Sequence, residues 1–182
     1  MAELSFEERL RTAHVTRWQI VRTAKQQSLA EHLYLVRVIT LEFAKCVGFG
    51  DKDTDLAEQW ALEHDVPEVR TGDLATPVKI AMREAVPQCD PIRNIELQMS
   101  DSYRDLYNEV KVTSPHVRAL VKMADILEAV VFLTVEGMGP HAASVKRELW
   151  QRFCDEIAEA KCKWPIYPWS AAYDIARHVT GA

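Results

Sequence analysis

The sequence predicts an all-α protein, a single helical bundle over residues 1–182, and three observations support this prediction. A serine followed three residues later by a glutamate, the pattern of a capping box at a helix N-terminus, occurs at Ser5–Glu8 and at Ser28–Glu31. Apolar residues after Ser28 recur with the 3.6-residue period of an α-helix. The chain shows no convincing pair of strands joined by a turn.

The N-terminal part of the chain is expected to form two helices separated by an extended segment. The first capping box opens a short helix that runs to about Ala13, and residues 15–22 then have an extended character. The second capping box opens a long helix that ends near Val47, because Gly48 suits the C-terminal cap. On this helix His32 lies on the apolar stripe formed by Leu29, Leu33, Val36, Ile39 and Phe43.

Prolines, glycines and capping residues divide the middle of the chain. Asp, Ser and Thr suit the N-cap of a helix, and proline suits its first turn. Gly72 permits a backbone conformation that other residues avoid. The expected elements are a turn at 51–55, a helix from Thr54 or Asp55 to about His64, an ordered loop at 66–76, a helix opened by Pro77, and, after a break at 87–91, an amphipathic helix at 91–110.

The C-terminal part is expected to contain two helices, an aromatic segment and a last short helix. The aromatic segment is expected to cover the core or a subunit contact. His14, His116, His141 and His178 lack partners in the sequence and are expected at the surface or in the core. The expected elements are a helix from Ser114–Pro115 to Glu136, ended by residues 137–140, then a helix at 144–160, the irregular segment 164–169 and a helix to His178.

The composition favours a small-molecule enzyme or binding protein over a nucleic-acid or membrane protein. A net charge of −5 with 27% charged residues argues against a nucleic-acid polymer as the main partner, whereas a small phosphorylated substrate needs only a local basic pocket. The sequence has neither a signal peptide nor an apolar run of membrane-spanning length, so we expect a cytoplasmic protein, in a cell or an infected host cell. Cys46, Cys89, Cys154 and Cys162 show no Cys-x-x-Cys spacing, which predicts reduced, mostly buried thiols.

The pair His64–Asp65 at an expected helix end is the strongest candidate for a metal site. Adjacent side chains inside a regular helix diverge by about 100°, so they could not converge there. Pro67 stops the helix nearby, and the chain can then turn so that both face one point. His32 and Asp125, each in apolar surroundings, supply further ligands. Two His and two Asp form a mixed set of nitrogen and oxygen ligands, which suits Co, Zn, Mn, Ni or Fe. Mg and Ca are less favoured, because they prefer sites made of oxygen ligands alone.

The order His…His-Asp…Asp, with these flanks, resembles the HD-domain phosphohydrolases. Within that superfamily the chain resembles the YfbR-like 5'-deoxynucleotidase group, including phage dATP triphosphohydrolases of the DatZ type. The resemblance spans residues 15 to 136. It rests on Arg17-Trp18, on residues 28–32, on residues 64–79, which include the run Glu-x-x-x-Gly-Asp-x-x-x-Pro-x-Lys, and on Lys122 with Asp125.

The resemblance implies roles for individual side chains around a divalent transition metal, with Mg²⁺ as a further ion at the phosphates. A metal would supply the activated water and the charge relief that phosphate hydrolysis needs. The implied metal ligands are His32, His64, Asp65 and Asp125, and Glu68 is the implied general acid or base beside His64 and Asp65. The implied substrate-binding residues are Arg17, Lys79 and Lys122 at the phosphates, Asp73 at the sugar hydroxyl, and Trp18 with Ile20 against the deoxyribose, where they exclude a 2'-hydroxyl.

These residues predict a metal-dependent phosphohydrolase of 2'-deoxyribonucleotides, in one of two versions. Compactness and Ile20 favour a triphosphohydrolase that releases a deoxynucleoside and tripolyphosphate from a dATP-type substrate. The alternative is a 5'-deoxynucleotidase that hydrolyses deoxynucleoside monophosphates. A non-catalytic nucleotide-binding module is disfavoured because all four ligand positions and Glu68 are intact, and a cyclic-nucleotide or (p)ppGpp hydrolase is disfavoured by the Arg-Trp pair and the Gly72-Asp73 run. The resemblance also implies a homo-oligomer, a dimer or a hexamer.

Overall fold

All regular secondary structure is helical in residues 3–181, the part of the chain that the computed structural model describes. These residues contain no strand and only two isolated β-bridges, Thr16 with Ser28 and Thr23 with Gly137. The all-α prediction is therefore confirmed. The helices are α1 Phe6–Leu10, α2 Leu29–Val47, α3 Asp51–Glu63, α4 Glu68–Thr71, α5 Thr76–Ala85, α6 Pro91–Met99, α7 Asp101–Asn108, α8 Pro115–Glu136, α9 Gly139–Lys163 and α10 Trp169–Thr180, with a 3₁₀ turn at Arg11–Ala13 and a π-helical turn at Glu109–Thr113.

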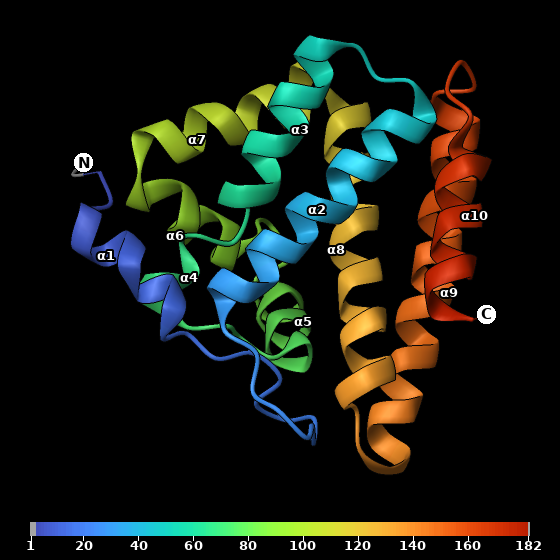
Figure 1. Cartoon of the computed structure of the whole chain (residues 1–182). Coiled ribbons are helices and arrows are strands. Elements are labelled where there is room, and N and C mark those ends of the chain that lie inside the picture. The colour runs from blue at the N-terminus through green and yellow to red at the C-terminus, as the bar shows by residue number, and fades with distance from the viewer. Residues whose placement is uncertain (1–2, 182) are drawn as a thin grey trace.

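Helix α8 forms the centre of the bundle, and it packs on α2, α3 and α9 (Figure 1). The main hydrophobic core lies between these helices and α10, with Phe43, Leu120, Phe153 and Trp169 among its fully buried side chains. A second cluster of buried residues joins the N-terminal turn of α2 to the chain that follows α3. It fixes the relative position of the two segments that carry the candidate metal ligands, and its members are Leu4, Leu29, Leu33, Val66 and Val69.

The helix signals of the sequence act as expected at the ends of α1, α2 and α8. The Ser5 side chain accepts a hydrogen bond from the backbone of Glu8, whose carboxylate accepts one in return from the Ser5 backbone. Ser28 caps α2, which ends at Gly48 with a left-handed φ of 76°. Pro115 lies in the first turn of α8, whose last residue is Glu136, as predicted.

Two predicted helix boundaries in the middle of the chain are wrong. The predicted turn at 51–55 is already helical, because Gly50 serves as N-cap and Asp51 and Asp53 complement the positive end of the helix dipole. The single helix predicted over 91–110 is broken at Ser100, whose backbone is extended and whose hydroxyl caps α7. The side chain of Glu3 accepts hydrogen bonds from Ser100 and from Ser102, and these contacts stabilise the break.

Three further segments differ from the sequence-based expectation. The predicted loop 66–76 contains α4, since Pro67 begins a single helical turn. Helix α9 begins at Gly139 rather than near residue 144, because Pro140 lies in its first turn, a position that suits proline. It also extends to Lys163. Residues 15–22 are not extended throughout, because a turn closes where the Val21 N–H bonds to the Trp18 carbonyl at 3.1 Å.

The cysteine side chains are less buried than the sequence predicts. All four thiols are free, but Cys89 and Cys162 are exposed and Cys46 and Cys154 half-buried, so the expectation of mostly buried thiols is wrong. Cys46, Cys154 and Cys162 lie on helix faces that the cysteine spacing does not reveal, and Cys89 lies in the connection between α5 and α6. Among the described residues, no helix is both long enough and apolar enough to span a membrane.

Candidate active site

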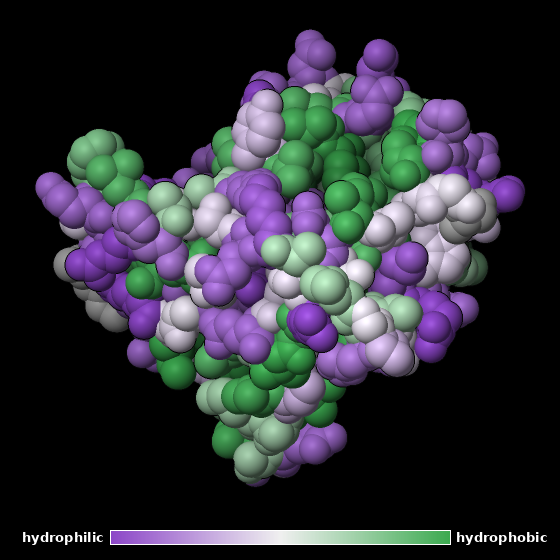
Figure 2. All heavy atoms as spheres, turned by 60° about the horizontal axis from the view of Figure 1, so that its bottom comes forward, coloured by the Kyte–Doolittle hydropathy of each residue, from purple (hydrophilic) through white to green (hydrophobic). Residues whose placement is uncertain are grey.

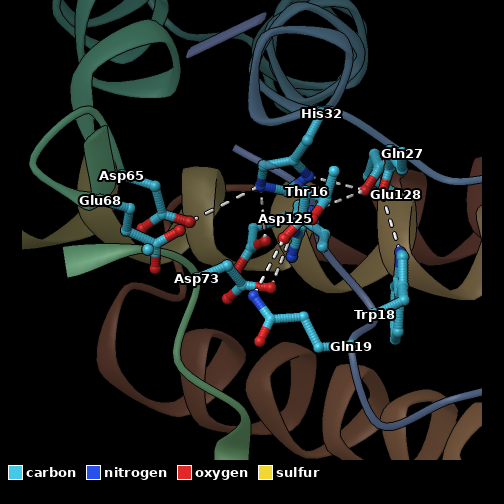
Figure 3. A network of polar contacts seen from close by, with 12 residues as sticks. Thr16, Trp18, Gln19, Gln27, His32, Asp65, Glu68, Asp73, Asp125 and Glu128 are labelled. Atoms are coloured by element: carbon cyan, nitrogen blue, oxygen red, sulfur yellow. Dashed lines mark hydrogen bonds and ion pairs between the residues drawn. The ribbon is translucent and has the colours of Figure 1, made fainter. Parts of the chain in front are cut away.

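Four side chains from three separate elements converge beside the N-terminal turn of α2, and Figure 3 shows three of them, His32, Asp65 and Asp125. His32 comes from that turn, His64 and Asp65 from the end of α3, and Asp125 from the middle of α8. Ligand atoms of His32, His64 and Asp125 all lie within 4.8 Å of one another. Asp65 Oδ2 lies 3.7 Å from His32 Nε2 and 3.4 Å from His64 Nε2. The turn after α3 thus brings an adjacent His and Asp to one point.

Hydrogen bonds on the far side of each imidazole aim its other nitrogen at this point. His32 Nδ1 lies 2.7 Å from Glu128 Oε2, and His64 Nδ1 lies 3.0 Å from the Ala61 carbonyl oxygen. Both partners are acceptors, so Nδ1 carries a hydrogen, and in the neutral imidazole Nε2 is the nitrogen with the free lone pair. Each Nε2 is buried and has no hydrogen-bond partner among the described residues. Two free imidazole nitrogens beside two carboxylates fit a divalent metal of borderline character.

Electrostatics keep Asp65 ionised at the centre of the cluster. Burial acts against its charge, but the neighbouring His64, His32 and Lys79 outweigh burial and hold the pKa of Asp65 well below its usual range. A metal requires this ionised carboxylate together with deprotonated imidazole nitrogens, so metal binding here would displace any proton on Nε2 of His32 and His64.

Glu68, in the single turn α4, is a buried carboxyl group with one free oxygen. Burial and the charge of Asp65 raise the pKa of Glu68 to about 8, although Lys79 acts in the opposite direction. Lys79 Nζ lies 2.9 Å from Glu68 Oε1, whereas Oε2 is buried without a hydrogen-bond partner among the described residues. A carboxyl group with this pKa can hold a proton at neutral pH and release it within the same site.

Two cations border the candidate metal cluster. Arg17 Nη1 lies 3.4 Å from Glu128 Oε2, and Arg17 Nε lies 4.0 Å from Asp73 Oδ2. Lys79 Nζ lies 3.9 Å from Asp73 Oδ1, so Asp73 stands between both cations. Burial disfavours both positive charges, but the surrounding carboxylates outweigh it and raise the pKa of Arg17 and of Lys79. Both side chains therefore remain charged beside the cluster, as anion binding requires.

Trp18 has a left-handed backbone, with φ of 65°, which is rare for an aromatic residue. This conformation costs on the order of 1–3 kcal/mol. It is held by two contacts of the indole: Nε1 donates to Gln27 Oε1 at 2.9 Å, and the ring stacks on Phe132 with centroids 5.6 Å apart. The chain turns here, so Trp18 and Ile20 do not follow the side-to-side alternation of an extended segment. Both nevertheless line the same cavity.

A cavity of about 570 Å³ adjoins Asp65 and Asp125, a volume within the usual range for small-molecule sites. Its walls come from the 17–21 turn, the 73–83 segment, α8 and α9, which gather at the lower end of the molecule in Figure 1. Figure 2 brings that end forward and shows hydrophilic and hydrophobic side chains interleaved over it. Charged or polar lining groups beyond the cluster include Arg83, His141, Glu148 and Arg152.

His32, His64 and Glu68 lie beside this cavity without lining it, and Lys122 is the one sequence-predicted site residue that lies in a different part of the structure. Its ammonium pairs with Glu156 of α9 and lies in a separate groove between α8 and α9. Positions three apart on a helix differ by about 60° in direction, which here is enough to turn Lys122 toward α9 while Asp125 faces the cluster.

Glu128 and Gln27 belong to the site, although sequence reasoning missed both. They are almost fully buried, with exposures of 2% and 0%, and Gln27 Nε2 lies 2.5 Å from Glu128 Oε1. A signal for Glu128 existed, since it follows Asp125 by three residues on an otherwise apolar stripe of α8. No comparable signal marks Gln27. His141, expected at the surface or in the core, also lines the cavity.

Comparison with known proteins links this geometry to one family. The family described as 5'-deoxynucleotidase YfbR-like matches residues 6–137. A dATP triphosphohydrolase of Cyanophage S-2L is 34% identical over 145 residues, which cover 80% of this chain and 78% of that protein. A dATP triphosphohydrolase of Acinetobacter phage SH-Ab 15497 is 30% identical over 96% of this chain and 90% of its own. The 5'-deoxynucleotidase ECA3034 of Pectobacterium atrosepticum is 30% identical over 62% of each chain.

A solved structure shows the same fold over the full length. The Cyanophage S-2L HD phosphohydrolase DatZ, bound to dA and one catalytic Zn²⁺ ion, superposes with a TM-score of 0.85. It is 28% identical, and the match covers 100% of both chains. On these matches, the chain belongs to the YfbR-like group of HD-domain phosphohydrolases.

Proposed function

We propose that this protein is a divalent-metal-dependent dNTP triphosphohydrolase of the dATP type, which releases a deoxynucleoside and tripolyphosphate. The observation that carries the proposal is the convergence of two unpartnered imidazole nitrogens with Asp65 and Asp125 at the edge of a nucleotide-sized cavity. His32, His64, Asp65 and Asp125 would hold the metal. Zinc is favoured among the borderline metals, because the DatZ structure contains one catalytic Zn²⁺ ion.

The side chains around the cluster have complementary roles in the proposed reaction. Bound there, a divalent cation would acidify water and withdraw charge from the phosphoryl oxygens. Arg17 and Lys79 bind and orient the phosphates, and Asp73 lies between them, where it can accept a hydrogen bond from the sugar. Glu68 holds a proton on Oε2, because burial raises its pKa, and passes that proton to the departing 5'-oxygen.

The triphosphate is favoured over the monophosphate by two observations. The phage dATP triphosphohydrolases match 80% and 96% of this chain, whereas the 5'-deoxynucleotidase match covers 62%. Arg83, which is paired with Asp90, and Arg152 also line the cavity and add positive charge for a longer phosphate chain. The second candidate, hydrolysis of deoxynucleoside monophosphates, is supported by the name of the matched family.

Product analysis separates these two activities. The purified protein, loaded with one metal at a time, is incubated with dATP or dAMP in ¹⁸O-labelled water and followed by phosphorus NMR. The proposal expects deoxyadenosine and tripolyphosphate from dATP, with the label in tripolyphosphate, since water attacks the α-phosphorus. Release of orthophosphate from dAMP alone would support the 5'-deoxynucleotidase instead. Stepwise release of orthophosphate from dATP would contradict both.

Substitution of Trp18 by alanine is expected to weaken discrimination between deoxyribo- and ribonucleotides. The indole lines the cavity and is fixed by Phe132, so its loss opens space where a 2'-hydroxyl would otherwise collide. An apolar wall rejects an added hydroxyl by about 10²-fold through solvation alone, and steric contact adds to this. The measurement is kcat/KM for dATP and for ATP in both proteins.

The matched control is Tyr34→Ala, which removes an exposed aromatic residue from α2. It should leave the ratio of the two kcat/KM values unchanged. An unchanged ratio in Trp18→Ala as well would mean that Trp18 does not face the sugar.

A further inference from the structure

A buried chain of hydrogen bonds connects the candidate metal ligand His32 to the cavity wall at Trp18 (Figure 3). Glu128 bonds to His32 Nδ1 through Oε2 at 2.7 Å and to Gln27 Nε2 through Oε1 at 2.5 Å. Gln27 Oε1 in turn accepts the indole N–H of Trp18 at 2.9 Å. The two side chains in the middle of this series, Gln27 and Glu128, are almost inaccessible to water, so solvent cannot replace these hydrogen bonds.

The Gln27 amide can take only one orientation in this chain. The carboxylate of Glu128 accepts hydrogen bonds, and an indole nitrogen only donates them. The amide must therefore direct its NH₂ group to Glu128 and its oxygen to Trp18, which is the orientation observed. Among side chains of this length, only glutamine donates and accepts in this way. Among the described residues, Gln27 is thus the side chain that hydrogen-bonds to both Glu128 and the Trp18 indole.

Gln27 also fixes the backbone on which Trp18 is mounted. Its carbonyl oxygen accepts the Arg17 N–H at 3.0 Å, one residue before the left-handed backbone of Trp18. Without the amide oxygen, the indole N–H would lose its partner in a half-buried position, and the ring would gain by tilting away from Phe132 toward water. The position of the ring in the cavity wall therefore depends on Gln27.

We propose that Gln27 is a positioning residue for sugar selectivity, which holds the Trp18 ring in the cavity wall and, through Glu128, ties it to the orientation of His32. This inference rests on the proposed function, in which Trp18 faces the deoxyribose. A ring held at a fixed angle excludes the 2'-hydroxyl by contact, whereas a ring free to tilt makes room for it. Gln27 itself lies behind the wall and does not line the cavity.

The test compares Gln27→Met, and Gln27→Leu as a second variant in case the first does not fold, with the control Gln26→Met. Gln26 is the exposed neighbour of Gln27 and carries the same side chain. Loss of one buried hydrogen bond corresponds to about a fivefold change, so the dATP-to-ATP ratio of kcat/KM should fall by about fivefold. Bound metal should stay at the wild-type level, because the bond between His32 and Glu128 is kept. A merely structural role would slow both substrates equally.

A second readout does not depend on turnover. The indole N–H resonance of Trp18, assigned with Trp18→Phe, should shift and exchange faster with water in Gln27→Met and in Glu128→Gln, but not in Gln26→Met. An unshifted resonance would overturn the link itself, and an unchanged dATP-to-ATP ratio would overturn its role in selectivity. If the wild-type protein hydrolyses no nucleotide, the proposed function and the proposed selectivity are both wrong. The indole N–H resonance would still show whether Gln27 holds the Trp18 ring.

Discussion

Asp65→Asn is expected to abolish hydrolysis while the protein remains folded and helical. Asp65 Oδ2 lies between the free Nε2 atoms of the two histidines, and its pKa is held well below the usual range, so an ionised oxygen is present where a metal would bind. An amide has no such charge. A metal contributes several kcal/mol to phosphoryl chemistry, so the loss in kcat should reach about 10³-fold or more. Turnover and metal content are measured on the same preparation.

The control for this substitution is Asp105→Asn, on the exposed face of α7. It makes the same chemical change far from the cluster and should keep full activity and metal. Circular dichroism and thermal unfolding establish that both variants are folded. If Asp65→Asn kept near wild-type turnover in a defined metal, Asp65 would not be a ligand.

Glu68→Gln is expected to keep the metal and lose rate by about 10²- to 10⁴-fold, the usual contribution of a general acid or base. The amide can still contact Lys79, so the local packing is conserved. The substitution removes the proton that Glu68 Oε2 can donate. Burial raises the pKa of this carboxyl group to about 8. Single-turnover kinetics and metal analysis separate the two effects.

Glu84→Gln, on the exposed side of α5, is the matched control and should behave as wild type. Loss of metal from Glu68→Gln to the extent seen with Asp65→Asn would instead identify Glu68 as a ligand. A wild-type rate in Glu68→Gln would assign proton transfer to another group.

The sequence was sufficient for the parts of the site that local patterns encode. The turn after α3 that joins His64 to Asp65 follows from Pro67, and the burial of His32 follows from its apolar stripe on α2. The four candidate ligands and Glu68 lie together, as their family resemblance implied, and Figure 3 shows three of the ligands with Glu68.

The remaining parts depend on contacts between distant segments. Glu128 meets His32 across 96 positions and Gln27 across 101, and no spacing in the sequence records such a meeting. Lys122 takes Glu156 on α9 as its partner, because the direction of a helical side chain is decided by the neighbouring helix as much as by its own. The break at Ser100 likewise rests on Glu3, far away at the N-terminus.

The most direct test of a catalytic metal in this protein is a metal titration of the chelated wild-type protein, with release of deoxynucleoside from dATP as the readout. Chelation should abolish activity, and one equivalent of a divalent metal per chain should restore it, because residues 3–181 bring one cluster of candidate ligands together. The same titration of His32→Ala should restore nothing at one equivalent. Full turnover in chelated protein, or equal recovery in His32→Ala, would contradict a catalytic metal at His32, His64, Asp65 and Asp125.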